Sequence, residues 1–371
     1  MAKTVRLGEF FSGPGGMAKG AEMAAADSEL RGRIELRHAW AVDFDGDSCE
    51  TYRENISIDS GDVHTMDARD AVERLDEFSA IDGFAFGFPC NDFSLVGRRL
   101  GLDGPYGPLF RSGIRVLEEK QPAWFVAENV SGLRSANGGR AFATILKAMA
   151  EAGYRIVPHL YRFEEYGVPQ KRHRVIIVGT REDLDLRFHV PAPTHGEGAL
   201  LKPFETVGKT FSRPMAPDVQ NNEPTRQSKK VVERLRLIDA GENAFNAKRM
   251  TDAHRLNVRG ATLSNIYRRL DPALPSYTIT GSGGGGTHVY HWEQDRALTN
   301  RERARLQSFD DDFVFSGGRA SVRRQIGMAV PPVGAKAIFG ALFRTLCGIE
   351  YSAVPSNLIH LVDEEQLELH L

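Results

Sequence analysis

Short apolar runs alternate with helix-compatible stretches along the first 180 residues. Apolar runs of four to eight residues bounded by turn signals predict buried strands, and their alternation with helices is typical of an α/β protein with helices on both faces of the sheet. The expected strands are Val5–Phe11, Leu36–Val42, Val63–Met66, Ile81–Phe88, Ala123–Ala127, Arg155–Arg162 and Arg174–Gly179. The expected helices in this half are Met17–Ala26, Leu109–Lys120 and Phe142–Ala152.

The pattern changes near Val190. Proline and glycine become frequent there and hydrophobic periodicity weakens, which predicts a domain boundary. A glycine-rich run at 281–286 is suited to backbone that lies close against a ligand. Thr299 and Glu302 have the spacing of a capping box that begins a helix, and a further helix is expected over Val333–Leu346.

The bulk composition is that of an ordinary globular protein. The chain has 371 residues, 41% of them hydrophobic, enough for one large domain and a smaller one. Its three cysteines are too few and too widely spaced for a disulfide framework or a metal cluster, so no metal is expected. No apolar run reaches membrane-spanning length and no signal peptide is evident, so we expect a cytoplasmic protein without a membrane partner.

The formal net charge of −2 conceals an uneven distribution. Residues 201–279 contain fourteen basic and eight acidic side chains, so this segment is positive and the remainder is negative. A basic module on an acidic body favours a polyanionic partner bound at one face. A solvated basic loop region is the alternative, equally compatible with charge alone.

The first strand runs directly into the glycine turn Ser12–Gly16. Pro14 and the adjacent glycines break the dinucleotide spacing, so a nicotinamide cofactor is disfavoured, and the absence of a Walker motif disfavours ATP. Asp43 ends the second strand, where a carboxylate can accept bonds from ribose hydroxyls, and Phe44 can stack on a base. Asp67 after the third strand could contact an adenine amine, although Asp62 competes for that role. The pattern predicts an adenosine-containing cofactor.

Two strands deliver groups suited to catalysis. Cys90 follows Pro89 at the exit of the fourth strand, where a thiolate could face a bound substrate, although a free cysteine is more often a small buried hydrophobe. Glu128 follows the fifth strand and could act as a general acid, or it could cap a helix. Arg172 and Arg174 could hold an anionic or carbonyl-rich substrate, or protect a sheet edge.

Six short stretches of the sequence resemble motifs of the DNA cytosine-5 methyltransferases of the bacterial modification type, and they occur in the same order as in that family. Each stretch alone is weak evidence for the family, but six stretches in the family's order are specific evidence. Together they span the chain except for about 190–274. The stretches are Phe10–Gly16, Gly87–Ser94, Glu128–Val130, Gln170–Arg174, Leu298–Phe313 and Gln325–Pro332.

The resemblance implies a Rossmann-like mixed sheet that binds S-adenosylmethionine, with helices on both faces. Residues 1–188 and 325–371 would form the catalytic domain, and 189–324 a smaller, irregular target recognition domain and hinge. The implied cofactor contacts are Phe11, Ser12, Gly13, Gly15, Gly16, Asp43, Phe44, Asp67, Pro89, Leu109 and Ala329. The implied DNA contacts are Ser94, Arg98, Arg99 and Gln170.

The family chemistry implies a role for each catalytic residue. Attack of the Cys90 thiolate on cytosine carbon 6 makes carbon 5 nucleophilic, Glu128 holds or protonates ring nitrogen 3, and Arg174 with Arg172 orients the base carbonyl. The target must leave the stacked duplex, so base flipping in double-stranded DNA is expected. The implied partners are DNA and a restriction endonuclease for the same site, and we expect a monomer.

Three residues depart from the family pattern, namely Asn91, Tyr106 and Met328, where glutamine, arginine and asparagine are usual. The first two bear on loop closure and the third on a cofactor contact. Two alternative functions share the motifs: an RNA cytosine-5 methyltransferase, and a catalytically inert DNA-binding regulator. The size of the basic segment argues against the first, and retention of Cys90 and Glu128 argues against the second. The recognised DNA sequence cannot be derived from these motifs.

Overall fold

The computed structural model describes residues 2–88, 109–256, 265–283 and 285–362. The chain folds into two compact units. Unit 1 comprises Met1–Arg162, His173–Ala192 and Pro332–Leu371, and unit 2 comprises Phe163–Arg172 and Pro193–Pro331.

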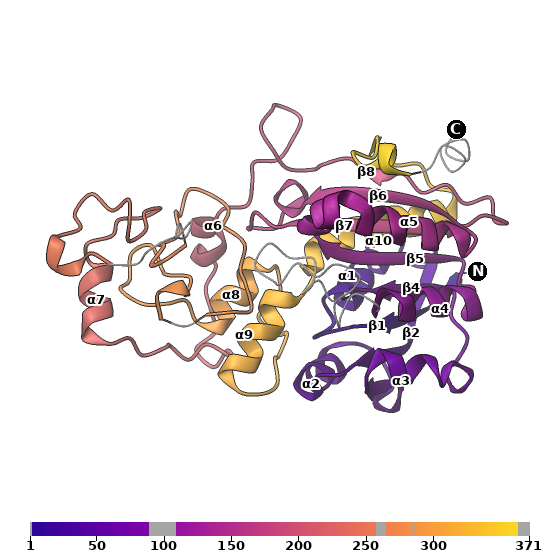
Figure 1. Ribbon diagram of the computed structural model, residues 1–371, viewed down its shortest axis with the longest axis horizontal. Helices are drawn as coiled ribbons and strands as arrows, with labels where there is room; N and C mark the ends of the chain where they lie inside the picture. The colour runs from indigo at the N-terminus through magenta and orange to yellow at the C-terminus, as the bar shows by residue number, and fades with distance from the viewer. Residues whose placement is uncertain (1, 89–108, 257–264, 284, 363–371) are drawn as a thin grey trace. The chain divides into compact units, whose positions relative to one another are not determined.

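Unit 1 is built on a seven-stranded sheet of order β3-β2-β1-β4-β5-β7-β6 (Figure 1). The first five strands in chain order are parallel, and β7 pairs antiparallel with both β5 and β6. The strands are β1 (Lys3–Phe10), β2 (Ile34–Asp43), β3 (Val63–Thr65), β4 (Gly83–Phe86), β5 (Trp124–Val130), β6 (Tyr154–Arg162) and β7 (His173–Arg181). This mixed α/β sheet confirms the predicted fold class.

Six helices belong to unit 1 within its described residues. They are α1 (Gly16–Ala25), α2 (Gly46–Asn55), α3 (Ala68–Val72), α4 (Phe110–Lys120), α5 (Arg140–Glu151) and α10 (Pro332–Cys347). The sequence did not predict α2 or α3, because α2 is polar and α3 is only five residues long. The unit also contains a short antiparallel pair, β8 (Val190–Pro191) and β9 (Ala353–Val354), and 3-10 turns that include η9 (Ile359–Leu361).

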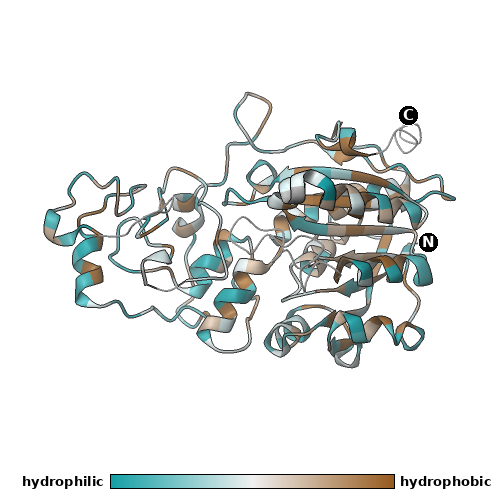
Figure 2. Cartoon of the chain, in the orientation of Figure 1, coloured by the Kyte–Doolittle hydropathy of each residue, from teal (hydrophilic) through white to brown (hydrophobic). Residues whose placement is uncertain are grey.

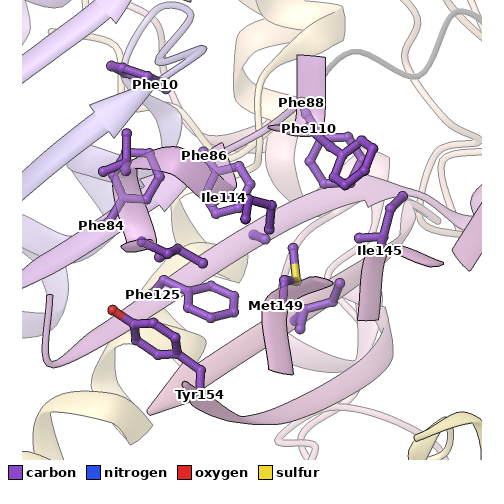
Figure 3. Close-up of a cluster of buried hydrophobic side chains, with 14 of the residues drawn as sticks. Phe10, Phe84, Phe86, Phe88, Phe110, Ile114, Phe125, Ile145, Met149 and Tyr154 are labelled. Carbon is purple, nitrogen blue, oxygen red and sulfur yellow. The ribbon is translucent and has the colours of Figure 1, made fainter. Parts of the chain in front are cut away.

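An aromatic core lies between the sheet and helices α3, α4 and α5. Phe84 and Phe125 are paired residues of adjacent strands and therefore point to the same face, where they meet side chains of α5 such as Ile145 and Met149 (Figure 3). Trp124 points to the opposite face and packs edge-on against Phe339 of α10. Helices therefore cover both faces of the sheet, as the alternation of elements predicted.

Two close contacts in unit 1 are possible because one partner is a glycine. A Cβ on Gly83 would lie 2.0 Å from the ring of Trp124 on the neighbouring strand, so the indole occupies the space of the missing side chain. A Cβ on Gly20 of α1 would lie 2.3 Å from the Cβ of Ala335 in α10, so these two helices pack with their backbones close together.

Unit 2 has short helices joined by irregular backbone. Its α-helices within the described residues are α6 (Val207–Ser212), α7 (Lys229–Leu235), α8 (Asn300–Leu306) and α9 (Arg319–Met328). Helix α8 begins with the predicted capping box, in which Thr299 and Glu302 bond reciprocally to each other's backbone amides. A small apolar cluster contains Leu235, Ile238, Ala244, Tyr267, Tyr290 and Ala297.

One helical run, 319–347, is long and apolar enough to span a membrane by length and composition alone. However, 78% of its most apolar stretch is buried inside the protein, as in the core helices of globular folds, so it is weak evidence for a span.

Candidate active site

Several predicted site residues among the described residues of unit 1 lie at one edge of its sheet. Parallel strands β1, β2, β4 and β5 all end at this edge, and β7, which is antiparallel, begins there. The crevice outside the carboxyl ends of the strands is the usual ligand site of open α/β sheets. The fold therefore places the glycine turn, Asp43, Glu128 and Arg174 along the same edge.

The turn after β1 has an unusual backbone. Phe11 has φ of 54°, Gly13 of 54° and Gly15 of 92°, all in the left-handed region. A Cβ on Gly13 would meet nothing within 4 Å, so the turn borders open space at that position. The hydroxyl of Ser12 is buried and has no hydrogen-bond partner among the described residues. An open turn with an unsatisfied buried hydroxyl fits a site for a polar ligand.

Asp43 fixes the glycine turn to the end of β2. One carboxylate oxygen accepts a hydrogen bond from the amide of Gly13 at 2.8 Å and the other from the amide of Asp45 at 2.9 Å. Burial raises the pKa of Asp43, an effect that these backbone bonds oppose. Phe44 beside it is 71% exposed, which leaves its ring available for stacking.

The strand register separates the two candidates for the adenine contact. Thr65 at the end of β3 pairs with Asp43, and the amide of Met66 donates to the Asp43 carbonyl at 3.0 Å. Asp67 therefore follows at the same edge, whereas Asp62 precedes β3 at its other end. Asp67 caps α3 and pairs with Arg69, whose guanidinium lowers the pKa of the Asp67 carboxyl.

Glu128 and Arg174 form an ion pair across adjacent strands. Arg174 lies opposite Val130 in the β5–β7 ladder, so its side chain shares a face with Glu128 and reaches it diagonally. The Arg174 Nε lies 2.8 Å from Glu128 Oε1, and each side chain is 13% exposed. A second guanidinium nitrogen donates to the His173 carbonyl at 2.8 Å. Both predicted groups are thus held together in a largely enclosed position.

The same carboxylate lies beside the segment that leads to Cys90. A Cβ on Gly87 would lie 3.3 Å from Glu128 Oε2, so the acid is close to the backbone three residues before the cysteine. Asn129, 2% exposed, donates from its side-chain amide to the Phe88 carbonyl at 3.0 Å. Our residue-by-residue prediction omitted Asn129, although its place in the Glu-Asn-Val motif was the available signal.

Some predicted site residues lie outside the described residues, namely Pro89, Cys90, Ser94, Arg98 and Arg99, and also the family departures Asn91 and Tyr106. Leu109 is described, and it is a buried residue at the N-terminus of α4. Gly16, the last glycine of the turn, is buried at the start of α1.

Gln170 and Arg172 belong to unit 2 and are enclosed there. Gln170 is fully buried, and its side chain bonds to the Leu306 carbonyl, the Gln307 side chain and the Ile279 amide at 2.8 to 3.1 Å. This geometry does not support the predicted DNA contact of Gln170, because its polar atoms are engaged inside the unit.

Arg172 is 1% exposed and its guanidinium donates to backbone carbonyls. The acceptors are Ile279, Gly327 and Ala329, at 3.0 to 3.1 Å. The geometry therefore does not support a contact of Arg172 with a base. Ala329, a predicted cofactor contact, is 5% exposed and ends α9, while Met328 beside it is 66% exposed.

Comparison with known proteins identifies the family. The model of the C-5 cytosine-specific DNA methylases matches residues 5–344. The chain is 52% identical to the type II methyltransferase M.BbvI of Brevibacillus brevis, covering 95% of this chain and 94% of that protein. It is 42% identical to M.NgoFVII of Neisseria gonorrhoeae, covering 87% of this chain and 82% of that protein.

Solved structures show the same fold. A prophage-encoded chain of Escherichia coli, assigned to the DNA modification methyltransferases, has a TM-score of 0.69 at 22% identity, over 92% of this chain and 99% of its own. The Dnmt2 methyltransferase of Schizosaccharomyces pombe has a TM-score of 0.55 at 16% identity, with the same coverage of both chains.

The fold and the edge site define an α/β methyltransferase, and the family and fold imply the use of S-adenosylmethionine. The chain belongs to the C-5 cytosine-specific DNA methylase family. It is a DNA (cytosine-5-)-methyltransferase, as the motif order predicted.

Proposed function

We propose that the chain methylates carbon 5 of one cytosine within a short recognition sequence of double-stranded DNA, as the modification enzyme of a restriction-modification system. The support is its likeness to type II methyltransferases over almost its whole length. A restriction endonuclease that cuts the same sequence is the expected partner. The enzyme acts in the cytoplasm, as a monomer and without a metal ion.

Cys90 is the proposed nucleophile, and the observation that carries this mechanism is the Glu128–Arg174 pair beside Gly87. The pair places an acid and a cation close to the segment before the cysteine, at the ligand edge of the sheet. A nearby positive charge favours the thiolate form of a cysteine, which is the nucleophile. Attack on a pyrimidine ring also needs a hydrogen-bonding or acidic group at nitrogen 3, where charge develops. Asn129 supports the arrangement by holding the carbonyl of Phe88.

The reaction proceeds through a covalent adduct. The Cys90 sulfur forms a bond to carbon 6 while the ring electrons move toward carbon 5 and nitrogen 3, where Glu128 stabilises the developing charge by hydrogen bonding or proton donation. The electron pair on carbon 5 forms the new bond to the methyl group, whose sulfonium carrier would leave as a neutral thioether, and carbon 5 then loses its proton to a base. The electron pair of that C–H bond re-forms the double bond as the sulfur leaves carbon 6, which restores the Cys90 thiolate.

Arg174 orients the Glu128 carboxylate and the carbonyl of the flipped base. Its fork geometry allows it to bond to the carboxylate and the His173 carbonyl while presenting another N–H to a ligand. For Arg172 and Gln170 we propose a positioning role within unit 2, since both are buried and bonded to its loops.

S-adenosylmethionine would supply an electrophilic methyl group on a sulfonium. The residues proposed to hold it are the turn from Phe11 to Gly16, Asp43, Phe44 and Asp67, with Pro89, Leu109 and Ala329 as further contacts. The open space at Gly13, the unpartnered Ser12 hydroxyl and the exposed ring of Phe44 support this fit. Asp43 keeps the turn in shape and can accept ribose hydroxyls with its remaining lone pairs.

Unit 2 is the proposed target recognition domain, and Ser94, Arg98 and Arg99 are proposed DNA contacts. The basic excess of residues 201–279, all of which belong to this unit, supports the assignment because phosphate contacts dominate affinity for DNA.

Bisulfite sequencing of plasmid DNA from cells that express the protein tests the function. We expect protected cytosines at one position of one short recurring sequence, and none with Cys90→Ser, because serine cannot supply a thiolate. Methylation at the wild-type level by Cys90→Ser would overturn the mechanism. Unprotected DNA from well-expressed, folded wild-type protein would overturn the proposed substrate.

A further inference from the structure

A cavity of about 240 Å³ lies at the β6 edge of unit 1. Arg155 and Val157 of β6, the segment 187–190 and residues around β9 form its walls. Arg155 pairs with Thr180 of β7, which in turn pairs with Trp124 at the start of β5. The cavity therefore lies toward the sheet edge opposite Glu128, and none of its lining residues belongs to the proposed active site.

The cavity exists because the C-terminal segment covers one face of an edge strand. Tyr154 and Ile156 belong to the aromatic core, so the alternate residues Arg155 and Val157 face the other way. Asn357 holds the covering segment in place, since its side chain accepts from the Leu160 amide at 2.8 Å and donates to the Leu160 carbonyl at 3.2 Å.

Most of the cavity wall is apolar. Val157, Phe188 and Val190 are buried lining residues, and Val354, Pro355 and Ile359 add further apolar surface. A cavity of roughly 150 Å³ with such walls can hold a benzene ring. This cavity is larger, so it can hold an aromatic ring together with a small substituent.

Arg155 is the one arginine that is buried within the described part of unit 1, at 9% exposure. One guanidinium nitrogen donates to the Leu186 carbonyl at 3.2 Å, but the buried Nε has no hydrogen-bond partner among the described residues. Arg155 also lines the cavity, and a planar guanidinium there can bond to an anion through nitrogens that its protein acceptors leave unused.

Two further basic residues line the same cavity, and both are exposed. They are Arg187 and His189, and no acidic side chain occurs among the described residues that line it. The backbone of His189 is fixed by the Tyr351 hydroxyl, which accepts from its amide and donates to its carbonyl, both at 3.0 Å. One member of this basic cluster therefore lies on a fixed segment.

We propose that this cavity binds a small organic phosphate. The phosphoryl group lies against Arg155, Arg187 and His189, and the apolar body of the ligand lies among Val157, Phe188 and Val354. Guanidinium groups bind phosphate oxygens through paired, charge-assisted hydrogen bonds, and the apolar walls exclude a fully hydrated ion. The site is separate from methyl transfer and does not depend on the proposed catalytic residues.

Titration calorimetry with phenyl phosphate tests the site, and the Cys90→Ser protein serves as the background so that catalysis plays no part. Arg155→Met keeps an unbranched side chain, although a shorter one, and removes the charge. Val354→Phe keeps every basic side chain and fills the cavity. Arg115→Met is the control, because Arg115 lies on the exposed face of α4, paired with Glu119.

We expect saturable one-site binding that weakens at least about tenfold in Arg155→Met and in Val354→Phe, and is unchanged in Arg115→Met. Inorganic phosphate should bind more weakly than phenyl phosphate, since it lacks the apolar body. Equal binding by wild type and Val354→Phe, or no binding up to about 10 mM, would overturn the proposal. Displacement of phenyl phosphate by a DNA duplex would also overturn it, since the occupant would then be a backbone phosphate.

Discussion

The two units of this enzyme bury different kinds of side chain. Unit 1 has an aromatic and aliphatic core around Phe84, Phe86 and Phe125. Unit 2 has apolar groups such as the cluster around Leu235 and Tyr290 and the ring contacts among Phe309, Phe313 and Phe315. It also buries six arginines within its described residues: Arg172, Arg234, Arg269, Arg301, Arg303 and Arg305. Figure 2 shows the contrast, with brown along the strands of the sheet and teal on α8.

In unit 2, buried arginine side chains donate hydrogen bonds to backbone carbonyls. In regular helices and strands, backbone amides would donate these bonds. Arg269 donates to the carbonyls of Leu235, His291 and Gln294 at 2.8 to 3.2 Å. Arg301 donates to those of Gln220, Asp310 and Phe313 at 2.8 to 3.0 Å. Irregular backbone leaves carbonyls unpaired, and a guanidinium with five donors can bond several of them from one point. A loop-rich module can therefore be ordered by polar side chains.

The largest expected effect tests the candidate active site at the sheet edge of unit 1. Glu128→Gln should lower kcat by about 10²- to 10⁴-fold, because the amide cannot donate a carboxyl proton to ring nitrogen 3. Single-turnover methylation of a duplex containing the target gives the rate, and DNA binding should change little. Asp82→Asn, a surface carboxylate paired with Arg6, is the matched control. A Glu128→Gln rate within threefold of wild type would contradict the assigned role.

The second-largest expected effect tests the buried arginines of unit 2. Arg172→Met should lower the free energy of unfolding by about 3 kcal/mol, since it leaves the buried carbonyls of Ile279, Gly327 and Ala329 without that donor. Urea denaturation followed by far-UV circular dichroism measures the change. Phe125→Ala in unit 1 should cost a similar ~3–5 kcal/mol through loss of packing. If Arg172→Met costs less than about 0.5 kcal/mol, the buried arginines are not what orders unit 2.

The smallest effect concerns the polar cluster beneath the glycine turn of unit 1. Glu9 is fully buried and accepts a bond from the Tyr52 hydroxyl at 2.9 Å, and burial raises the pKa of Glu9 to about 8. Burial also lowers the pKa of the neighbouring His38 to about 4. Glu22 faces His38 from α1 at 3.7 Å.

The two shifts act in different pH ranges. The unfolded chain releases the Glu9 proton near pH 4.5 and the folded chain near pH 8, so this group lowers stability as pH rises between those values. His38 raises stability with pH between about 4 and 6.5, and above pH 6.5 only the Glu9 effect remains.

From pH 6.5 to about 8 the wild-type unfolding free energy should therefore fall by up to ~1.4 kcal/mol per pH unit relative to Glu9→Gln. Urea denaturation of both proteins across this range measures the difference. Parallel pH profiles would show that Glu9 is ionised in the folded protein.

The sequence alone determined the sheet of unit 1 and the protein family. Apolar runs separated by turns predicted each strand of the sheet to within a few residues, because buried parallel strands need continuous hydrophobic segments. The motifs predicted the family and pointed to Cys90, Glu128 and Arg174 as candidate catalytic groups. The signals for turns, for the capping box and for helices also come from short stretches of sequence, so each can be recognised from a few neighbouring residues.

Only the tertiary structure decided how distant residues meet. The diagonal pairing of Glu128 with Arg174 follows from the register of β5 and β7, and the bond from Asn129 to Phe88 joins strands that sequence spacing does not relate. The polar sequence of α8 gave no sign that its arginines are buried, because burial of a guanidinium depends on carbonyls supplied by segments far away in the chain. Hydrophobic patterning therefore encodes the sheet, whereas the positions of buried polar groups emerge only when the backbone that satisfies them has folded.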